Sequence, residues 1–129
     1  MKLVLLLTVA VLSGCANPNL VGLRGDKLDT RYGLQDRRAA KMHIKLFEEQ
    51  VPPGNTSTRT YQVERCNQYA QDEKPSKQTL TDDLIMLAYA EGADAVSDIK
   101  FYSESAILKN CWTVERASGM FWISGPSPR

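Results

Sequence analysis

An amphipathic segment followed by a glycine and an apolar run, residues 79–102, limits the possible folds more than any other part of the chain. In its first half, apolar side chains recur with the 3.6-residue period of a helix that buries one face, at Leu80, Leu84, Ile85, Leu87 and Ala88. The second half, residues 93–102, has the composition of a strand. The segment therefore predicts a helix and a strand that pack together as a local unit.

Both ends of this helix carry recognisable signals. Thr79 is the predicted N-cap, because its hydroxyl can accept the backbone N–H of Asp82. Asp82 and Asp83 would place negative charge beside the positive end of the helix dipole, which explains this carboxylate pair without a catalytic role. Gly92 is predicted to end the helix in the left-handed conformation.

Period-2 patterns and turn residues predict further strands at residues 42–47, 60–66, 108–114 and 120–123. Residues 52–54, Pro-Pro-Gly, predict a turn, residues 103–105 a loop, and residues 118–119 the turn between the last two strands. These elements predict an α+β domain, with a single small sheet of about four or five strands packed against one helix in the order β-β-α-β-β.

The first residues resemble an export signal. Lys2 precedes a short apolar run, residues 3–12, that is too short to span a bilayer. Residues 12–15, Leu-Ser-Gly-Cys, resemble the lipobox of bacterial lipoproteins, which implies cleavage after Gly14 and acylation of Cys15 with diacylglycerol and a fatty acid such as palmitate. The alternative is an ordinary signal peptide with a chance cysteine. Ala16 occupies the position where an aspartate commonly retains such proteins at the inner membrane, so the expected location is the outer membrane, facing the periplasm.

The expected organisation follows from these segments. It comprises a signal peptide at 1–14, the lipidated cysteine and a flexible linker at 15–41, an α+β periplasmic domain at 42–124 and a frayed end at 125–129. Residues 16–41 lack a sustained apolar period and therefore predict a tether. The alternative there is a short partner-binding helix around Tyr32, Leu34 and the pair Arg37-Arg38.

With Cys15 assigned to lipid, Cys66 and Cys111 remain, and two cysteines in an oxidising compartment predict a disulfide. The bond would close a loop of 45 residues and stabilise the domain by roughly 4 kcal/mol. Free or regulatory thiols are an alternative. A zinc site would need about four ligands, and the chain offers these cysteines and His43 without metal-ligand spacing.

Composition disfavours several functional classes. Loss of Lys2 with the leader takes the 16 basic side chains to 15, equal to the 15 acidic ones, so no nucleic-acid partner is expected. The single histidine and the lack of GxSxG, P-loop and HExxH motifs predict no enzyme activity, no cofactor and no small-molecule substrate. Trp112, Phe121 and Trp122 either pack in the sheet or line an exposed binding surface.

A family resemblance rests on the lipobox, the two spaced cysteines and residues 90–96, Ala-Glu-Gly-Ala-Asp-Ala-Val. On these features, the chain resembles the Rcs stress-sensor outer-membrane lipoproteins and related small cysteine-pair envelope lipoproteins of unknown function. The resemblance covers about residues 42–123. Cys66 and Cys111 match one of the two disulfides of the sensors, whereas the second pair has no counterpart here.

This resemblance implies a domain that binds other envelope proteins, without a cofactor or turnover. The expected function is therefore a protein-binding module anchored to the membrane through Cys15, in envelope-stress sensing or signalling. The alternative is an accessory structural subunit of an envelope, secretion or conjugation complex.

Overall fold

The computed structural model describes residues 20–48 and 54–124. The predicted signal peptide, Cys15 and the predicted frayed C-terminus lie outside the described residues.

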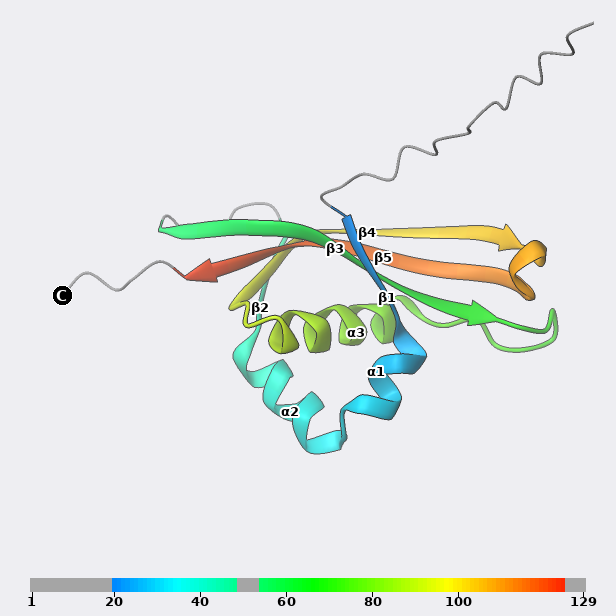
Figure 1. Ribbon diagram of the computed structural model, residues 1–129, viewed down its shortest axis with the longest axis horizontal. Helices are drawn as coiled ribbons and strands as arrows, with labels where there is room; N and C mark the ends of the chain where they lie inside the picture. The colour runs from blue at the N-terminus through cyan, green and yellow to red at the C-terminus, as the bar shows by residue number, and fades with distance from the viewer. Residues whose placement is uncertain (1–19, 49–53, 125–129) are drawn as a thin grey trace, which may run out of the picture.

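The domain is α+β, as predicted, but it contains more helices than predicted. In chain order the elements are β1 (Leu20–Arg24), α1 (Gly25–Arg31), α2 (Leu34–His43), β2 (Lys45–Phe47), β3 (Asn55–Asn67), α3 (Lys77–Ala90), β4 (Ala95–Ala106), the 3-10 turn η1 (Ile107–Lys109) and β5 (Cys111–Ser124). The strands form one mixed sheet in the order β1-β3-β5-β4-β2. Figure 1 shows α1, α2 and α3 on one side of this sheet. We call the other side the helix-free face.

Helix α3 supplies the centre of the core, as its apolar period predicted. Its side chains Leu80, Leu84, Ile85, Leu87 and Ala88 are all buried, and the helix packs on β3, β4 and β5. The helix begins earlier than predicted, because the Ser76 hydroxyl, not that of Thr79, is the N-cap and accepts the Thr79 N–H at 3.1 Å. Gly92 follows the helix with φ +76°, as predicted.

The last part of the chain forms one long strand, β5, where two strands and a turn were predicted. Gly119 lies inside β5, and a Cβ there would stand 2.8 Å from Val96 Cγ1, so glycine permits close packing and makes no turn. Residues 103–105, a predicted loop, belong to β4. The pairing register shifts between Ser57 and Thr60 in β3 and between Ser97 and Lys100 in β4, so both neighbours of β5 bulge near Gly119. Such bulges strengthen the twist, and the sheet curls around α3.

Residues 20–43 are not a flexible linker, and the folded part begins well before residue 42. β1 pairs in parallel with β3, and Leu28 of α1 and Ala40 of α2 are buried in the main core. Met42 and His43 end α2, so the predicted strand 42–47 is reduced to Lys45–Phe47. The sequence pattern is weak here because short helices bury only one or two side chains each.

Two leucine substitutions test the assigned helix faces. Leu84 is fully buried whereas Leu34 of α2 is 75% exposed. We expect Leu84→Ala to cost about 2–5 kcal/mol in the free energy of unfolding, because lost transfer energy and cavity formation add. Leu34→Ala should change it by about 0.5 kcal/mol or less. Urea titrations that gave equal losses would contradict this assignment.

Candidate functional site: the disulfide-bound end of the sheet

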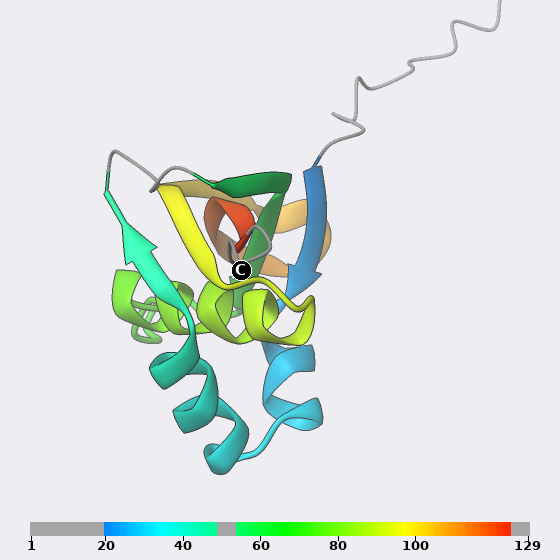
Figure 2. The ribbon, with the colours of Figure 1, turned by 90° about the vertical axis from the view of Figure 1, so that its left-hand side faces the viewer.

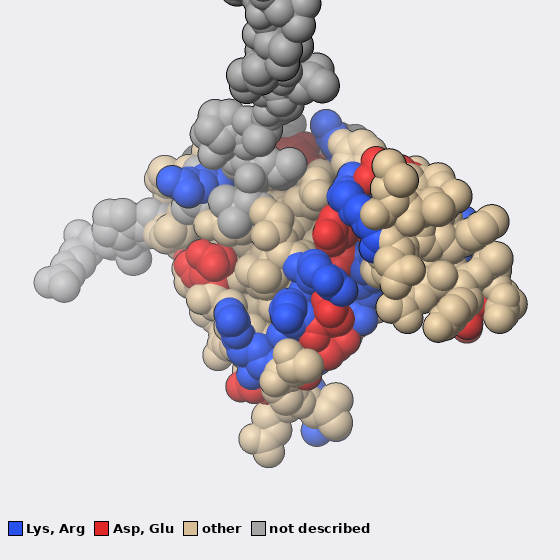
Figure 3. Space-filling model, turned by 45° about the vertical axis from the view of Figure 1, so that its right-hand side comes forward, with Lys and Arg blue, Asp and Glu red and all other residues tan. Residues whose placement is uncertain are grey.

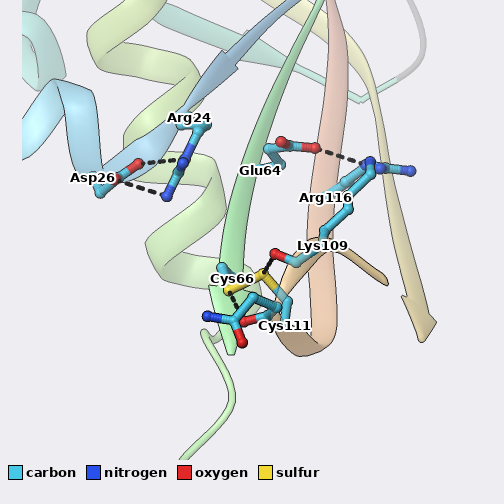
Figure 4. Close-up of a disulfide and its surroundings, with 8 residues drawn as sticks. Arg24, Asp26, Glu64, Cys66, Lys109, Cys111 and Arg116 are labelled. Atoms are coloured by element: carbon cyan, nitrogen blue, oxygen red, sulfur yellow. Dashed lines mark hydrogen bonds and ion pairs between the residues drawn. A yellow bond between two sulfur atoms is a disulfide. The ribbon is translucent and has the colours of Figure 1, made fainter. Parts of the chain in front are cut away.

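The predicted disulfide between Cys66 and Cys111 is present in the structure. Cys66 lies near the end of β3 and Cys111 begins β5, with Cα atoms 5.5 Å apart. Both cysteines pack with Ala106 and Val114 in a small apolar cluster separate from the main core. Figure 4 shows the bond between the ends of these strands, close to Lys109 of η1. The disulfide therefore holds an end of the sheet that the main core does not reach.

His43 does not join the two cysteines. It ends α2, and its Nε2 lies 3.1 Å from Asp94 Oδ1, immediately before β4. Cys111 pairs with Ala106 at the opposite end of β4. Within residues 20–48 and 54–124 no group of three or more His, Cys, Asp or Glu side chains is arranged to hold a metal ion.

Two cavities adjoin the disulfide, with volumes of about 340 and 250 Å³. They share Arg24, Cys66 and Gln68, so together they form one surface, which we call the disulfide groove. The larger cavity is also lined by Asp26, Arg65, Asn67, Asp72, Glu73 and Pro75, and the smaller by Glu64, Lys109, Asn110, Cys111 and Val114. On the molecular surface, basic and acidic side chains gather in a band beside a lobe made mainly of uncharged residues (Figure 3).

The larger cavity contains acidic groups without a cationic partner in the described part of the chain. Arg24 pairs with Asp26 at 3.1 Å, as Figure 4 shows, and Arg65 is engaged elsewhere, as described below. Asp72 and Glu73 form no ion pair with any described residue. Asn67 is buried, and its Nδ2 has no hydrogen-bond acceptor among the described residues. A buried amide donor without a partner is costly.

A buried charge network lies behind this groove. Asp83 of α3 is fully buried and accepts two hydrogen bonds from Arg65 of β3, at 2.6 and 2.8 Å. Arg65 also binds Asp29 of α1 at 2.8 Å, and Arg37 of α2 bridges Asp29 and Asp83. This network joins three helices to the sheet.

The interpretation of Asp82 and Asp83 as first-turn helix charges is therefore wrong. The helix starts at Lys77, so Asp83 is in its second turn, on the buried face beside Leu80 and Leu84. Its position three residues after Leu80 was the signal that could have indicated burial. Asp82 is on the outer side and binds Lys41 at 2.6 Å.

The network shifts two pKa values in opposite directions. Hydrogen bonds to Asp83 and, to a smaller extent, to Asp29 raise the pKa of Arg65. The hydrogen bond from Arg65 lowers the pKa of Asp29. Because the folded-state pKa of Asp29 is lowered, its contribution to stability is complete above the pKa of an unfolded aspartate, about 3.9, and is lost as the pH falls through the folded-state value.

The three aromatic residues considered from the sequence do not form one groove. Phe121 is buried and stacks on Tyr61 with ring centroids 4.1 Å apart. The Trp122 indole donates a hydrogen bond to Ser97 Oγ at 2.8 Å. Trp112 is half exposed near the disulfide. Two of these residues therefore serve the packing of the sheet.

Arginine substitutions test the buried network. We expect Arg65→Met to cost about 3–5 kcal/mol in the free energy of unfolding, because it leaves the Asp83 carboxylate buried with weaker compensation. Arg24→Met removes an exposed ion pair and should cost about 1 kcal/mol or less. Chemical denaturation at neutral pH measures both, and similar losses would show that Asp83 does not depend on Arg65.

Cysteine substitutions test the structural role of the disulfide. Cys66→Ser and Cys111→Ser should each cost about 4 kcal/mol, because each removes the same crosslink of a 45-residue separation. The double variant should be no less stable than either single variant. In the unmodified protein the thiols should react with an alkylating reagent only after reduction. A domain that stayed equally stable after reduction would contradict the structural role and favour a redox switch.

Comparisons of the chain with protein-family models, with curated proteins and with solved structures found no match. None of the helices within the described residues is long and apolar enough to cross a membrane.

Proposed function

We propose that this protein is a lipid-anchored module that binds another protein of the cell envelope through the disulfide groove. The observation that carries this proposal is the groove itself, where Asp72 and Glu73 lack cationic partners among the described residues. Its charge favours a basic segment of polypeptide.

The character of the groove supports a macromolecular partner. Small-molecule sites are typically concave and mostly apolar with a few converging polar groups. The larger cavity here is instead lined mainly by charged and amide side chains. The disulfide fixes Cys66 and the Arg65–Asp83 pair fixes Arg65, so the β3 side of the groove is organised before a partner arrives, which lowers the cost of binding.

Anchoring is proposed through Cys15, on the lipobox-like residues 12–15. β1 begins at Leu20, the fifth residue after Cys15, and an extended chain covers about 3.4 Å per residue, so the anchor lies within about 17 Å of β1. Figure 2 shows that β1 begins away from the helices and runs toward α1. A lipid at Cys15 would thus keep the domain close to the bilayer with the helix-free face toward it.

The location proposed from Ala16 is the periplasmic side of the outer membrane. Within this framework, the resemblance to Rcs-type sensors supports a role in envelope-stress signalling. An accessory structural subunit of an envelope complex is the second candidate.

Charge reversal in the groove tests this function. A photo-crosslinking amino acid in place of Gln68 should join the full chain to a partner protein in living cells. Glu73→Lys should reduce that adduct by about tenfold, because repulsion of a basic segment replaces attraction. Glu48→Lys, the same charge change beside a different cavity, should not reduce it. An adduct insensitive to Glu73→Lys would contradict the groove as the binding surface.

Palmitate labelling of the same cells tests the anchor separately. The unmodified chain should incorporate the label, and Cys15→Ser should not, because Cys15 is the proposed acylation site. A chain that matured without label would refute lipidation and leave the crosslinking result to stand on its own.

A further inference from the structure

The outer edge of β4 is free over much of its length. β2 pairs with β4 only at residues 95–97, and β4 continues to Ala106. Beyond the bulge after Ser97, residues 100–105 pair with β5 on one side, and no described strand pairs with residues 99–105 on the other. Such an edge offers unpaired N–H and C=O groups to a further strand.

We infer that this edge pairs with the same edge of a second copy of the chain, as an antiparallel β4–β4 contact centred on Tyr102. Directly opposed residues in antiparallel strands point to the same face of the sheet. In a symmetric contact, each residue must therefore lie opposite one whose side chain is on the same face. Lys100, Tyr102 and Glu104 lie on the helix-free face, where they line an open cavity of about 560 Å³. Ile99 and Phe101 pack instead against the core.

Several registers keep side chains of the same face opposite each other, and charge favours the one centred on Tyr102. With Tyr102 opposite itself, Lys100 of each copy faces Glu104 of the other. Arg116 lies between Glu64 at 3.0 Å and Glu104 at 2.6 Å, so this group carries one surplus negative charge. Lys100 forms no ion pair with any described residue. A shift by two residues in either direction would place Tyr102 opposite Lys100 or Glu104 and lose both ion pairs.

The same register brings exposed apolar groups together at both ends of the contact. Phe47 of β2 pairs with Ser97 and Leu46 pairs with Val96, so β2 of one copy comes level with Ile107 and Leu108 of η1 in the other. Leu46, Ile107 and Leu108 are all large exposed hydrophobics. Two-fold symmetry therefore covers apolar surface that a single copy leaves in water.

Symmetry also suits the proposed anchor, and this step alone rests on the proposed function. The two-fold axis of an antiparallel strand pair is perpendicular to the sheet, so both copies present the helix-free face in the same direction. Two lipid anchors at Cys15 would then reach the same bilayer. A parallel edge contact would turn one copy over and direct its anchor away.

Engineered cysteines in the full chain test the contact. Tyr102→Cys should form a disulfide-linked dimer under mild oxidation, because directly opposed residues have Cα atoms about 4.5–5.5 Å apart, within disulfide range. Ser105→Cys is the matched control, since its two copies would stand about 20 Å apart along the strands. Tyr102→Cys should yield at least about tenfold more dimer than Ser105→Cys. Equal yields, or a link from residue 102 to a different protein, would overturn the inference.

Charge variants in the Tyr102→Cys chain test the register. Lys100→Glu should lower the yield of dimer by about tenfold, and adding Glu104→Lys should restore it, because the two cross-copy ion pairs return with reversed sign. Lys27→Glu on α1 should leave the yield unchanged. Thermal unfolding of each variant establishes that the monomer is folded. A yield indifferent to Lys100→Glu in a folded chain would refute this register.

Membranes and detergent distinguish failure of the contact from failure of the anchor. In detergent, the Tyr102→Cys chain that also carries Cys15→Ser should still form the dimer, because the edge itself supplies the contacts. Dimer in membranes alone would also support the contact, with anchoring supplying the local concentration. Absence of dimer in both preparations would overturn the inference, whatever palmitate labelling shows.

Discussion

The buried carboxylate of Asp83 is the constraint on which the arrangement of this domain depends. A charge taken out of water must be met by opposite charge and hydrogen bonds, and Arg65 supplies both from β3. A Cβ at Gly25 would come within 2.4 Å of Asp83 Oδ2, so α1 can approach only because that position is glycine. Arg37 and Asp29 extend the pairing to α2 and α1. The segment before β2 is therefore fixed to the core by charge as much as by apolar contact.

The curled sheet separates two kinds of surface. Near α3, bulges on both sides of β5 bend the strands around the helix. Farther along, β3, β4 and β5 extend beyond the end of α3 (Figure 1), and the disulfide stabilises this region in place of a large core. The disulfide side of the groove and the far end of the free β4 edge belong to this extended part. Both proposed interaction surfaces thus include the part of the sheet that has only the small cluster of Ala106, Cys111 and Val114 as its core.

Several elements of the fold were predictable because their signals are local. The α3 stripe and Gly92 depend on residues close in sequence, and the structure agrees with both. Setting Cys15 aside for its lipobox-like context left Cys66 and Cys111 as the predicted pair, and the structure contains that disulfide. Residues 20–43 were misread as a linker because their burial depends on few side chains, Leu28 and Ala40 among them. The pattern of β5 was misread because Ser118-Gly119 has the composition of a turn. In the structure, Gly119 is needed because Val96 packs too close to leave room for a Cβ.

The sequence by itself determined the α+β class, the face of α3 that is buried and the pair of cysteines that meet, since each follows from periodicity, composition or count. Only the tertiary structure decided that Asp83 is buried against Arg65, 18 residues away, that Asp72 and Glu73 lack partners among the described residues, and that residues 99–105 form an open edge. The physical reason is that the curl of the sheet brings segments distant in sequence side by side. These segments decide which groups a charge or a strand edge can contact.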